Sequence, residues 1–311
     1  MVVLRKPAKP SYLVPKAYRL VILLSTLAKV LTAIVVECLS NLVKAHHLLL
    51  KTYFGGMPGQ TTTDAIHHLV HKIKTAWRND QVASVLFLDV EGAFPNAVTD
   101  RLLHNLKKRR IPAILVRFVA RLLTNRKTRI KFDNHISDYY NITNRIGQGD
   151  PLSMLLYIIY NADLLKITDD ETTEDTIGYM DNIALLATGN DFKETTIWLK
   201  QLMTKEDSGL QWSKEHNSRF EVTKSAIIHF TRKTSPDPDS EQGRMPMERP
   251  KLMLKGQEVE EVECYKYLGV QIDSQLQWKE QAQQATTNAT KWLLQYRRLT
   301  RPSTRVNPKL M

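Results

Sequence analysis

The sequence is short of cysteine, glycine and proline, and each shortage excludes a class of protein. Its 311 residues include 2 cysteines, 12 glycines and 13 prolines, while 42% are hydrophobic. This balance excludes a collagen-like or mostly disordered chain and is ordinary for one large or two smaller globular domains. Cys38 and Cys264 form neither a disulfide framework nor a zinc-binding spacing. We therefore expect an intracellular location and a core that needs no covalent staple.

A secretory signal and an uninterrupted membrane-spanning run are also missing. The chain opens MVVLRKPAKPSY, where the apolar core of a signal peptide would have to begin. Lys29 and Glu37 interrupt the most apolar stretch, which runs from Leu20 to Val43. A spanning helix needs about 20 nearly uncharged residues. The stretch therefore predicts a buried core helix in a protein that is not secreted and has no membrane partner.

Acidic residues are absent from three long segments, although the chain as a whole carries both signs. Lys and Arg number 44 against 32 Asp and Glu, a net charge of +12. Residues 1–36, 101–132 and 291–311 contain basic residues and no acid. Nucleic acid is the first candidate partner for such segments, and solvated helix faces are the alternative. The residues expected to contact a nucleic-acid backbone are Lys107, Lys108, Arg109, Arg110, Arg126, Lys127 and Arg129.

The middle of the chain alternates apolar runs with helical patterns. Residues 82–90 (VASVLFLDV) predict a buried strand. The following segments predict, in order, two helices separated by Pro112, a hairpin turning at Asp133–Asn134, a buried helix from Pro151, a hairpin turning at Asp181–Asn182, a helix capped by Asp191 and a strand over 225–231. Beyond them we expect more strand with a turn at Gly256–Gln257, and then a helix over 281–299. Without the hairpin at 133–134, the order from residue 82 to 231 is that of a ferredoxin-like sheet.

Two aspartates are brought together by this topology. The first and third strands of a ferredoxin-like sheet are central neighbours, so Asp89 at the end of the first should lie beside Asp181 before the third. Mg²⁺ commonly takes one or two carboxylates plus substrate phosphates, and two such ions can assist phosphoryl transfer. The sequence therefore predicts a magnesium site. The alternative, which spacing alone leaves open, is two solvated aspartates at a strand end and a turn.

Seven segments occur in an order that matches a known family. They are KPSYLVPKAYRLVILLSTLAKVL, YFGGMPGQTTTDAI, FLDVEGAFPNA, GQGDPLS, YMDN, the strand that carries Lys224, and YKYLGVQID. Together, from about Lys6 to about Tyr296, they resemble the reverse transcriptases of non-LTR (LINE-like) retrotransposons. The resemblance implies an α+β, right-hand polymerase fold of fingers, palm and thumb, whose palm is the ferredoxin-like sheet. Residues 1–275 would form fingers and palm, with the palm core at about 82–124 and 148–232, and 276–311 the truncated start of a thumb.

The resemblance also implies roles for residues around the two aspartates. Asp89 and Asp181 would hold two Mg²⁺ ions, or Mn²⁺ as an alternative, and the Val90 carbonyl would add a ligand. Lys224 matches a lysine that acts as general acid for the leaving pyrophosphate. Phe94 matches an aromatic gate that rejects a 2′-hydroxyl. From the residues alone, Phe94 as plain core and Lys224 as a solvated lysine stay open.

Further resemblances concern the nucleotide and the primer. Arg19 matches an arginine that contacts the incoming triphosphate. Gln148 and Gly149 match a loop that positions nucleotide and template. Tyr267, Leu268 and Gly269 resemble the primer grip. The implied activity is RNA-directed DNA synthesis on an RNA template and a DNA primer from dNTPs, with no obligate protein partner evident and with the nucleus as the expected location.

Some positions depart from the family pattern. Asn182 stands where the family's Tyr-x-Asp-Asp turn has its second aspartate, which removes a negative charge from the metal site. Two arginines expected after Gly56 are Met57 and Gln60 here. A second hypothesis is therefore a catalytically silent remnant that only binds primer–template. A third, RNA binding in the manner of an RRM, is disfavoured because the first strand offers only Phe87 as a stacking aromatic.

Overall fold

The protein is described from a computed structural model, in residues 1–7, 9–142, 146–147, 149–168, 173–236 and 244–299. Its centre is one sheet whose four longest strands are mutually antiparallel and have the order β11-β3-β9-β8. This is the ferredoxin-like order, so the predicted topology is confirmed. The strands are β3 (Val82–Glu91), β8 (Glu174–Tyr179), β9 (Asn182–Gly189) and β11 (Ala226–Phe230), extended by β10 (Arg219–Phe220) beside β3 and by β16 (Glu260–Glu261) beside β11.

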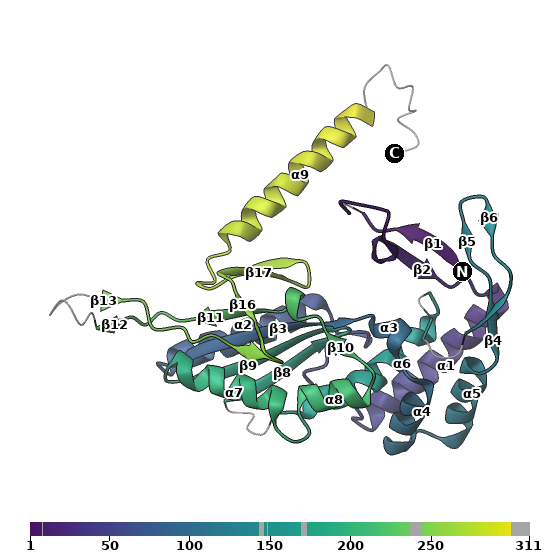
Figure 1. Ribbon diagram of the computed structural model, residues 1–311, viewed down its shortest axis with the longest axis horizontal. Helices are drawn as coiled ribbons and strands as arrows, with labels where there is room; N and C mark the ends of the chain where they lie inside the picture. Colours follow the sequence, from purple (N-terminus) through teal and green to yellow (C-terminus); the bar gives the residue numbers. More distant parts are fainter. Residues whose placement is uncertain (8, 143–145, 148, 169–172, 237–243, 300–311) are drawn as a thin grey trace.

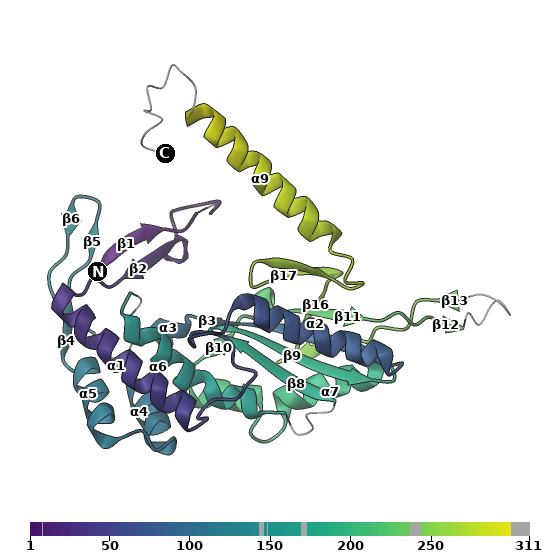
Figure 2. The same cartoon turned by 180° about the vertical axis from the view of Figure 1, so that it is seen from behind.

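Strand β3 is buried on both faces, which explains its continuous apolar sequence. Phe87 belongs to a cluster with Leu69 and Ile73 of helix α2 (Thr62–Arg78). Leu86 belongs instead to a cluster with Leu199 of helix α7 (Phe192–Thr204). Because successive strand residues point to opposite faces, the sheet forms the middle of three layers. Figures 1 and 2 show α2 on one face and α7 with α8 (Gly209–Glu215) on the other.

A second group of helices packs beside the sheet. It comprises α1 (Thr26–Ala45), α3 (Ala93–Asn96), α4 (Thr99–Lys108), α5 (Ala113–Leu123) and α6 (Pro151–Asn161), and the 3₁₀ segment η2 (Ala162–Lys166) follows α6. Their common core includes Leu39, Leu102, Val119 and Tyr160. The two helices separated by Pro112 and the helix beginning at Pro151 are thus confirmed.

The apolar stretch from Leu20 to Val43 does not form one buried helix. Its first residues belong to strand β2, and α1 begins only at Thr26. One face of α1 packs inward through Leu39 and Val43, whereas Leu27 is 81% exposed and Ile34 55%. The predicted buried core helix is therefore buried on one face only, because apolar residues surround the helix while its neighbours cover one side. Among the described helices, α1 alone has the length and composition to cross a membrane, a test that core helices also pass.

The N-terminal residues build a small sheet with a hairpin from the middle of the chain. Its order is β2-β1-β5-β6, with β1 (Val2–Arg5), β2 (Tyr18–Val21), β5 (Lys131–Phe132) and β6 (His135–Ile136). The predicted turn at Asp133–Asn134 is confirmed by the Phe132–His135 pairing. The hairpin is attached through β4 (Arg126–Thr128) and β7 (Tyr140–Ile142), and the 3₁₀ segment η1 (Pro15–Ala17) precedes β2.

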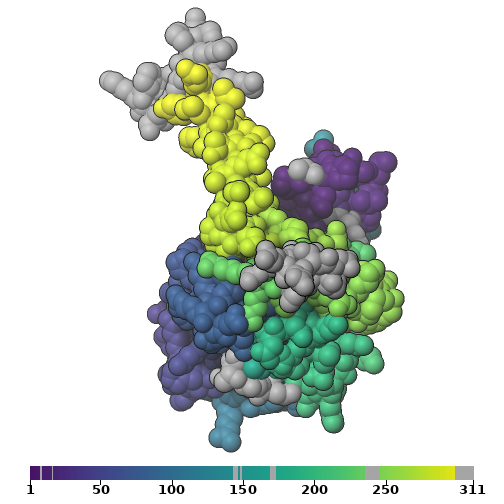
Figure 3. Space-filling model, turned by 90° about the vertical axis from the view of Figure 1, so that its left-hand side faces the viewer, coloured from purple at the N-terminus to yellow at the C-terminus, as the bar shows by residue number. Residues whose placement is uncertain are grey.

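The C-terminal third adds short hairpins and one projecting helix. The small elements are η3 (Val222–Lys224), β12 (Ser235–Pro236), β13 (Arg244–Met245), β14 (Met253–Leu254), β15 (Gln257–Glu258), β17 (Cys264–Tyr267) and β18 (Val270–Asp273). Leu254 pairs with Gln257, so this turn is at Lys255–Gly256, one residue before the predicted position. Helix α9 (Lys279–Leu299) stands clear of the body as a column (Figure 3).

Candidate functional site

The two predicted aspartates meet at one end of the central sheet. Asp89 of β3 is paired with Asn182, the first residue of β9. The next residue, Val90, donates its N–H to the Asp181 carbonyl over 3.2 Å. The predicted adjacency of Asp89 and Asp181 is therefore confirmed. The turn itself consists of Met180 and Asp181, not of Asp181 and Asn182 as predicted, because β8 and β9 are closed by a Tyr179–Asn182 pair.

Buried side chains form hydrogen bonds to the backbone of this turn. Met180 has a φ of +58°, an uncommon conformation for a residue with a side chain. Its carbonyl accepts hydrogen bonds from the Tyr53 hydroxyl at 3.1 Å and from Asn161 Nδ2 at 3.0 Å. Gly55 lies so close that an added Cβ would be 2.6 Å from the Met180 nitrogen. Sequence reasoning missed Tyr53 and Asn161, since bonds to a distant backbone carbonyl leave no periodic pattern.

The pKa of Asp181 is raised by burial and by the neighbouring charge of Asp89. Lys224 opposes both effects. Asn182 donates Nδ2–H to Asp181 Oδ1 over 3.1 Å. The site thus offers two mutually repelling carboxylates and one amide oxygen. These oxygen ligands suit a hard divalent cation. No group of three or more His, Cys, Asp or Glu side chains gathers as a metal site within the described residues.

Lys224 is directed at the same site. Its Nζ lies 3.3 Å from Asp89 Oδ2 and forms a close ion pair with Glu221. Burial lowers the pKa of Lys224, but the hydrogen bonds and attraction to Glu221 and Asp89 outweigh burial and raise it overall. The predicted strand lysine lies instead at the end of η3, just before β11. Its ammonium is thus kept protonated within reach of the carboxylates.

Cations of the N-terminal sheet lie near this end of the central sheet. Arg19 is exposed on β2, paired with Leu4. Burial lowers the pKa of Lys6, and repulsion from Lys9, Arg19 and Lys224 lowers it further, which indicates that these cations are neighbours. Lys6 was missed as a site residue because one lysine within a basic segment carries no distinguishing signal. Clustered cations beside two carboxylates could hold a polyphosphate between them.

Two further predicted residues flank the carboxylates. Phe94 is half-buried in α3, directly after β3, with its ring 4.9 Å from that of Tyr157. Gly149 has a φ of +108°, and an added Cβ would be 2.7 Å from the Ile22 carbonyl. The Gly149 loop therefore lies against the end of β2. Gln148 lies outside the described residues.

The predicted primer-grip residues form the β17–β18 hairpin. Leu268 and Gly269 are its two turn residues, with φ of +49° and +92°. Tyr267 is buried, with its ring 5.0 Å from that of Phe87 on β3. The neighbouring Tyr265 stacks on Phe87 at 4.6 Å and donates its hydroxyl hydrogen to the Lys224 carbonyl over 3.2 Å. The hairpin therefore packs on β3 and is hydrogen-bonded to the backbone at Lys224.

The predicted nucleic-acid contacts divide into several groups. Arg109 is buried and pairs with Asp163 at 2.6 Å, so the prediction that it contacts a nucleic-acid backbone was wrong: it fixes α4 to η2. Lys108 shares Asp163 at 3.1 Å but keeps an exposed side chain. Lys127 and Arg129 are exposed at β4 and just after it, and Arg126 is half-buried. Lys107 and Arg110 are exposed near the end of α4.

Comparison with protein families gives one family for most of the chain. Residues 4–272 match the family described as reverse transcriptase (RNA-dependent DNA polymerase). Over 280 residues the chain is 26% identical to a probable RNA-directed DNA polymerase from transposon BS of Drosophila melanogaster, covering 89% of this chain and 29% of that protein. It is 25% identical over 264 residues to the RNA-directed DNA polymerase from mobile element jockey of the same fly, covering 84% and 27%. The chain thus spans less than a third of these relatives' length.

Solved structures share the fold. The apo telomerase of Candida tropicalis matches with a TM-score of 0.53 at 8% identity, over 81% of this chain and 40% of that one. The same enzyme in complex with a fragment of telomeric RNA matches with a TM-score of 0.51 at 10% identity, over 82% and 37%. At such low identity the likeness concerns the fold alone, which is the right-hand arrangement expected from the sequence.

Proposed function

Because the chain belongs to the reverse transcriptase (RNA-dependent DNA polymerase) family, we propose that it carries out RNA-directed DNA synthesis for a non-LTR retrotransposon. The relatives named as polymerases of mobile elements support the retrotransposon assignment. The structural observation that carries the proposal is the meeting of Asp89 and Asp181 at the β3–β9 junction, with Lys224 3.3 Å from Asp89.

In the proposed reaction the 3′-hydroxyl of a primer, paired to an RNA template, attacks the α-phosphate of a dNTP. The hydroxyl loses its proton to water as the new P–O bond forms, and the bond from the α-phosphorus to pyrophosphate breaks. Asp89 and Asp181, with the Val90 carbonyl, would hold two Mg²⁺ or Mn²⁺ ions, which supply activation of the hydroxyl and neutralisation of the phosphates. Lys224 Nζ, which its carboxylate neighbours keep protonated, donates a proton to the leaving pyrophosphate.

The surrounding residues position the substrates. Arg19 and Lys6 bind the triphosphate from the side of the N-terminal sheet, where repulsion from both Arg19 and Lys224 lowers the pKa of Lys6. Phe94, held against Tyr157, lies under the incoming sugar and rejects a 2′-hydroxyl. Gly149, which lies against the end of β2, contacts the nucleotide and template, and the same role for Gln148 rests on the sequence resemblance alone. The β17–β18 hairpin supports the primer end, since it is stacked on β3 next to the carboxylates.

Asn182 supports a second candidate, a remnant that binds primer–template without turnover. Its amide donates a hydrogen to Asp181 where the family has a second negative charge. One charge fewer weakens the attraction for two dications, and ligand charge is a main determinant of their affinity. The two candidates differ in turnover and agree in nucleic-acid binding.

Primer extension on an RNA template with Mg²⁺ separates them. We would compare the unaltered chain with Asn182→Asp and Asp89→Ala, and measure primer–template binding for each. Extension by the unaltered chain but not by Asp89→Ala establishes the polymerase. Extension by Asn182→Asp alone shows an assembled site that one missing carboxylate silences. If all three bind duplex and none extends, the polymerase assignment for this chain is refuted and the remnant remains.

A further inference from the structure

We propose that the α4–α5 helical pair carries a second RNA-binding surface, apart from the Asp89–Asp181 site, for single-stranded template RNA. We define this surface by four basic residues: Lys107 at the end of α4, Arg110 after it, and Arg117 and Arg121 on α5. All four side chains are exposed. The inference rests on the proposed use of an RNA template, and it adds a binding site that the catalytic reaction does not require.

The position of the surface separates it from the site of synthesis. In both ribbon views α4 and α5 lie on the far side of the molecule from α9, while the carboxylates lie where β3 meets α3 (Figures 1 and 2). None of the four cations belongs to the strands that carry the Asp89–Asp181 site or to the β17–β18 hairpin. What they bind is therefore a question separate from the chemistry at the carboxylates.

The charge on the surface is not neutralised locally. None of the four residues has an acidic partner among the described residues. Asp163 is paired with Arg109 and Lys108, and Glu215 with Arg101, so these two acids are engaged elsewhere. The four cations thus form an exposed cluster of one sign, and such clusters attract polyanions.

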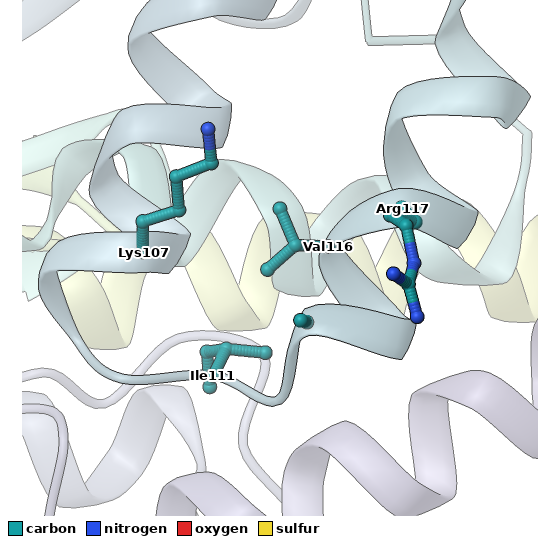
Figure 4. A pocket seen from close by; sticks show the side chains of 5 residues that line it. Lys107, Ile111, Val116 and Arg117 are labelled. Atoms are coloured by element: carbon teal, nitrogen blue, oxygen red, sulfur yellow. The ribbon is translucent and has the colours of Figure 1, made fainter.

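The shape of the surface favours a nucleic-acid strand. Lys107 and Arg117 border a hollow of about 230 Å³ that is also lined by Ile111, Ala113 and Val116 (Figure 4). A hollow of this size is open to more than a single water molecule. An apolar hollow between two cations suits an unstacked base with its flanking phosphates, and Arg121 one turn beyond Arg117 suits the next phosphate. A paired helix offers no such free base, so the surface fits single-stranded RNA.

The test compares two triple variants of the full chain. The first, Lys107→Ala with Arg117→Ala and Arg121→Ala, removes three charges from the surface. The matched control, Lys74→Ala with Lys200→Ala and Lys214→Ala, removes three exposed charges from α2, α7 and α8. Thermal unfolding checks that both variants fold. Binding of a labelled single-stranded RNA without primer is then measured from about 50 to 200 mM salt.

The first variant should bind this RNA about tenfold more weakly than the control. Its plot of log affinity against log salt should be flatter by about 2, since each lost phosphate contact on a single strand contributes about 0.7. A saturating primer–template duplex should leave the RNA bound to the unaltered chain. Equal binding by the two triple variants, or displacement of the RNA by the duplex, would overturn the second surface. Neither result depends on primer extension, so the polymerase assignment is tested separately.

Discussion

Two buried histidines should make the fold sensitive to mild acid. His216 and His229 are 3% and 2% exposed. Burial lowers the pKa of each from 6.5 to about 4. His216 Nδ1 donates to the Trp212 carbonyl at 3.0 Å and its Nε2 lies 3.4 Å from the Asn105 amide nitrogen, so a second ring proton would face a donor. His229 Nε2 is buried without a partner in the described structure, where a proton would find no acceptor.

These two pKa values set the direction and the size of the change in folding stability with pH. The folded pKa lies below the unfolded one, so the unfolded chain binds more protons between pH 6.5 and 4. The full stability is present above pH 6.5 and is lost as pH falls through this window. At 1.36 kcal/mol per pH unit, each histidine contributes about 3 kcal/mol, and the two give a slope approaching 2.7 kcal/mol per unit. Against a typical stability of about 5–15 kcal/mol, this loss is large.

Urea unfolding at pH 7.5, 6.5, 5.5 and 5.0, followed by circular dichroism, measures the slope. His229→Asn should reduce it by about half, whatever its effect on stability at pH 7.5. Asp163 and Asp175 have pKa values below the usual 3.8, so their loss of charge acts at lower pH and does not obscure the window. Constant stability from pH 7.5 to 5.0, or an unchanged slope in the variant, would refute the assignment of these histidines as buried neutral groups.

Three further substitutions test other contacts. Tyr53→Phe removes one of the two hydrogen-bond donors to the Met180 carbonyl. Primer extension should then slow about fivefold, which corresponds to about 1 kcal/mol, while the affinity for the duplex stays unchanged. An unaltered rate would show that this hydrogen bond does not position the turn. Gly55→Ala places a Cβ 2.6 Å from the Met180 nitrogen and should slow extension more than Tyr53→Phe does, and a smaller effect would contradict this packing. Arg109→Ala should lower the free energy of unfolding in urea by about 3 kcal/mol, because Arg109 neutralises the largely buried Asp163. RNA binding should not weaken. Weaker RNA binding by a folded variant would show that Arg109 contacts nucleic acid after all.

Much of the central sheet was predictable because its signals are local. The strand at 82–90 is predicted by its apolar run, and the hairpins are predicted by their periodicity and turn residues. The ferredoxin-like order then places Asp89 beside Asp181. The turn was misplaced by one residue because Met180 adopts a left-handed φ that sequence preference assigns elsewhere. Only packing from outside the hairpin explains that conformation.

What could not be predicted depends on contacts between distant segments. Arg109 looked like its exposed neighbours, and only the position of Asp163, 54 residues later, makes it structural. Tyr53 and Asn161 meet the Met180 carbonyl from different elements. Helix α1 has apolar residues around most of its circumference, so its sequence does not predict which face packs against the neighbouring helices. In each case the partner is fixed by the tertiary fold.

The central place of β3 also sets the order in which a nascent chain can fold. Both long neighbours of β3 are translated after it, and the Ser84–His229 hydrogen bond joins residues 145 apart. At about 5–20 residues per second, the strand leaves the ribosome roughly 7–30 s before its last partner. During that interval its apolar run is an aggregation hazard. Helix α2, translated just before β3, can shield the face that carries Val85 and Phe87, but the opposite face must wait for α7. Synthesis of the protein therefore has a vulnerable period that ends only when residue 230 has emerged.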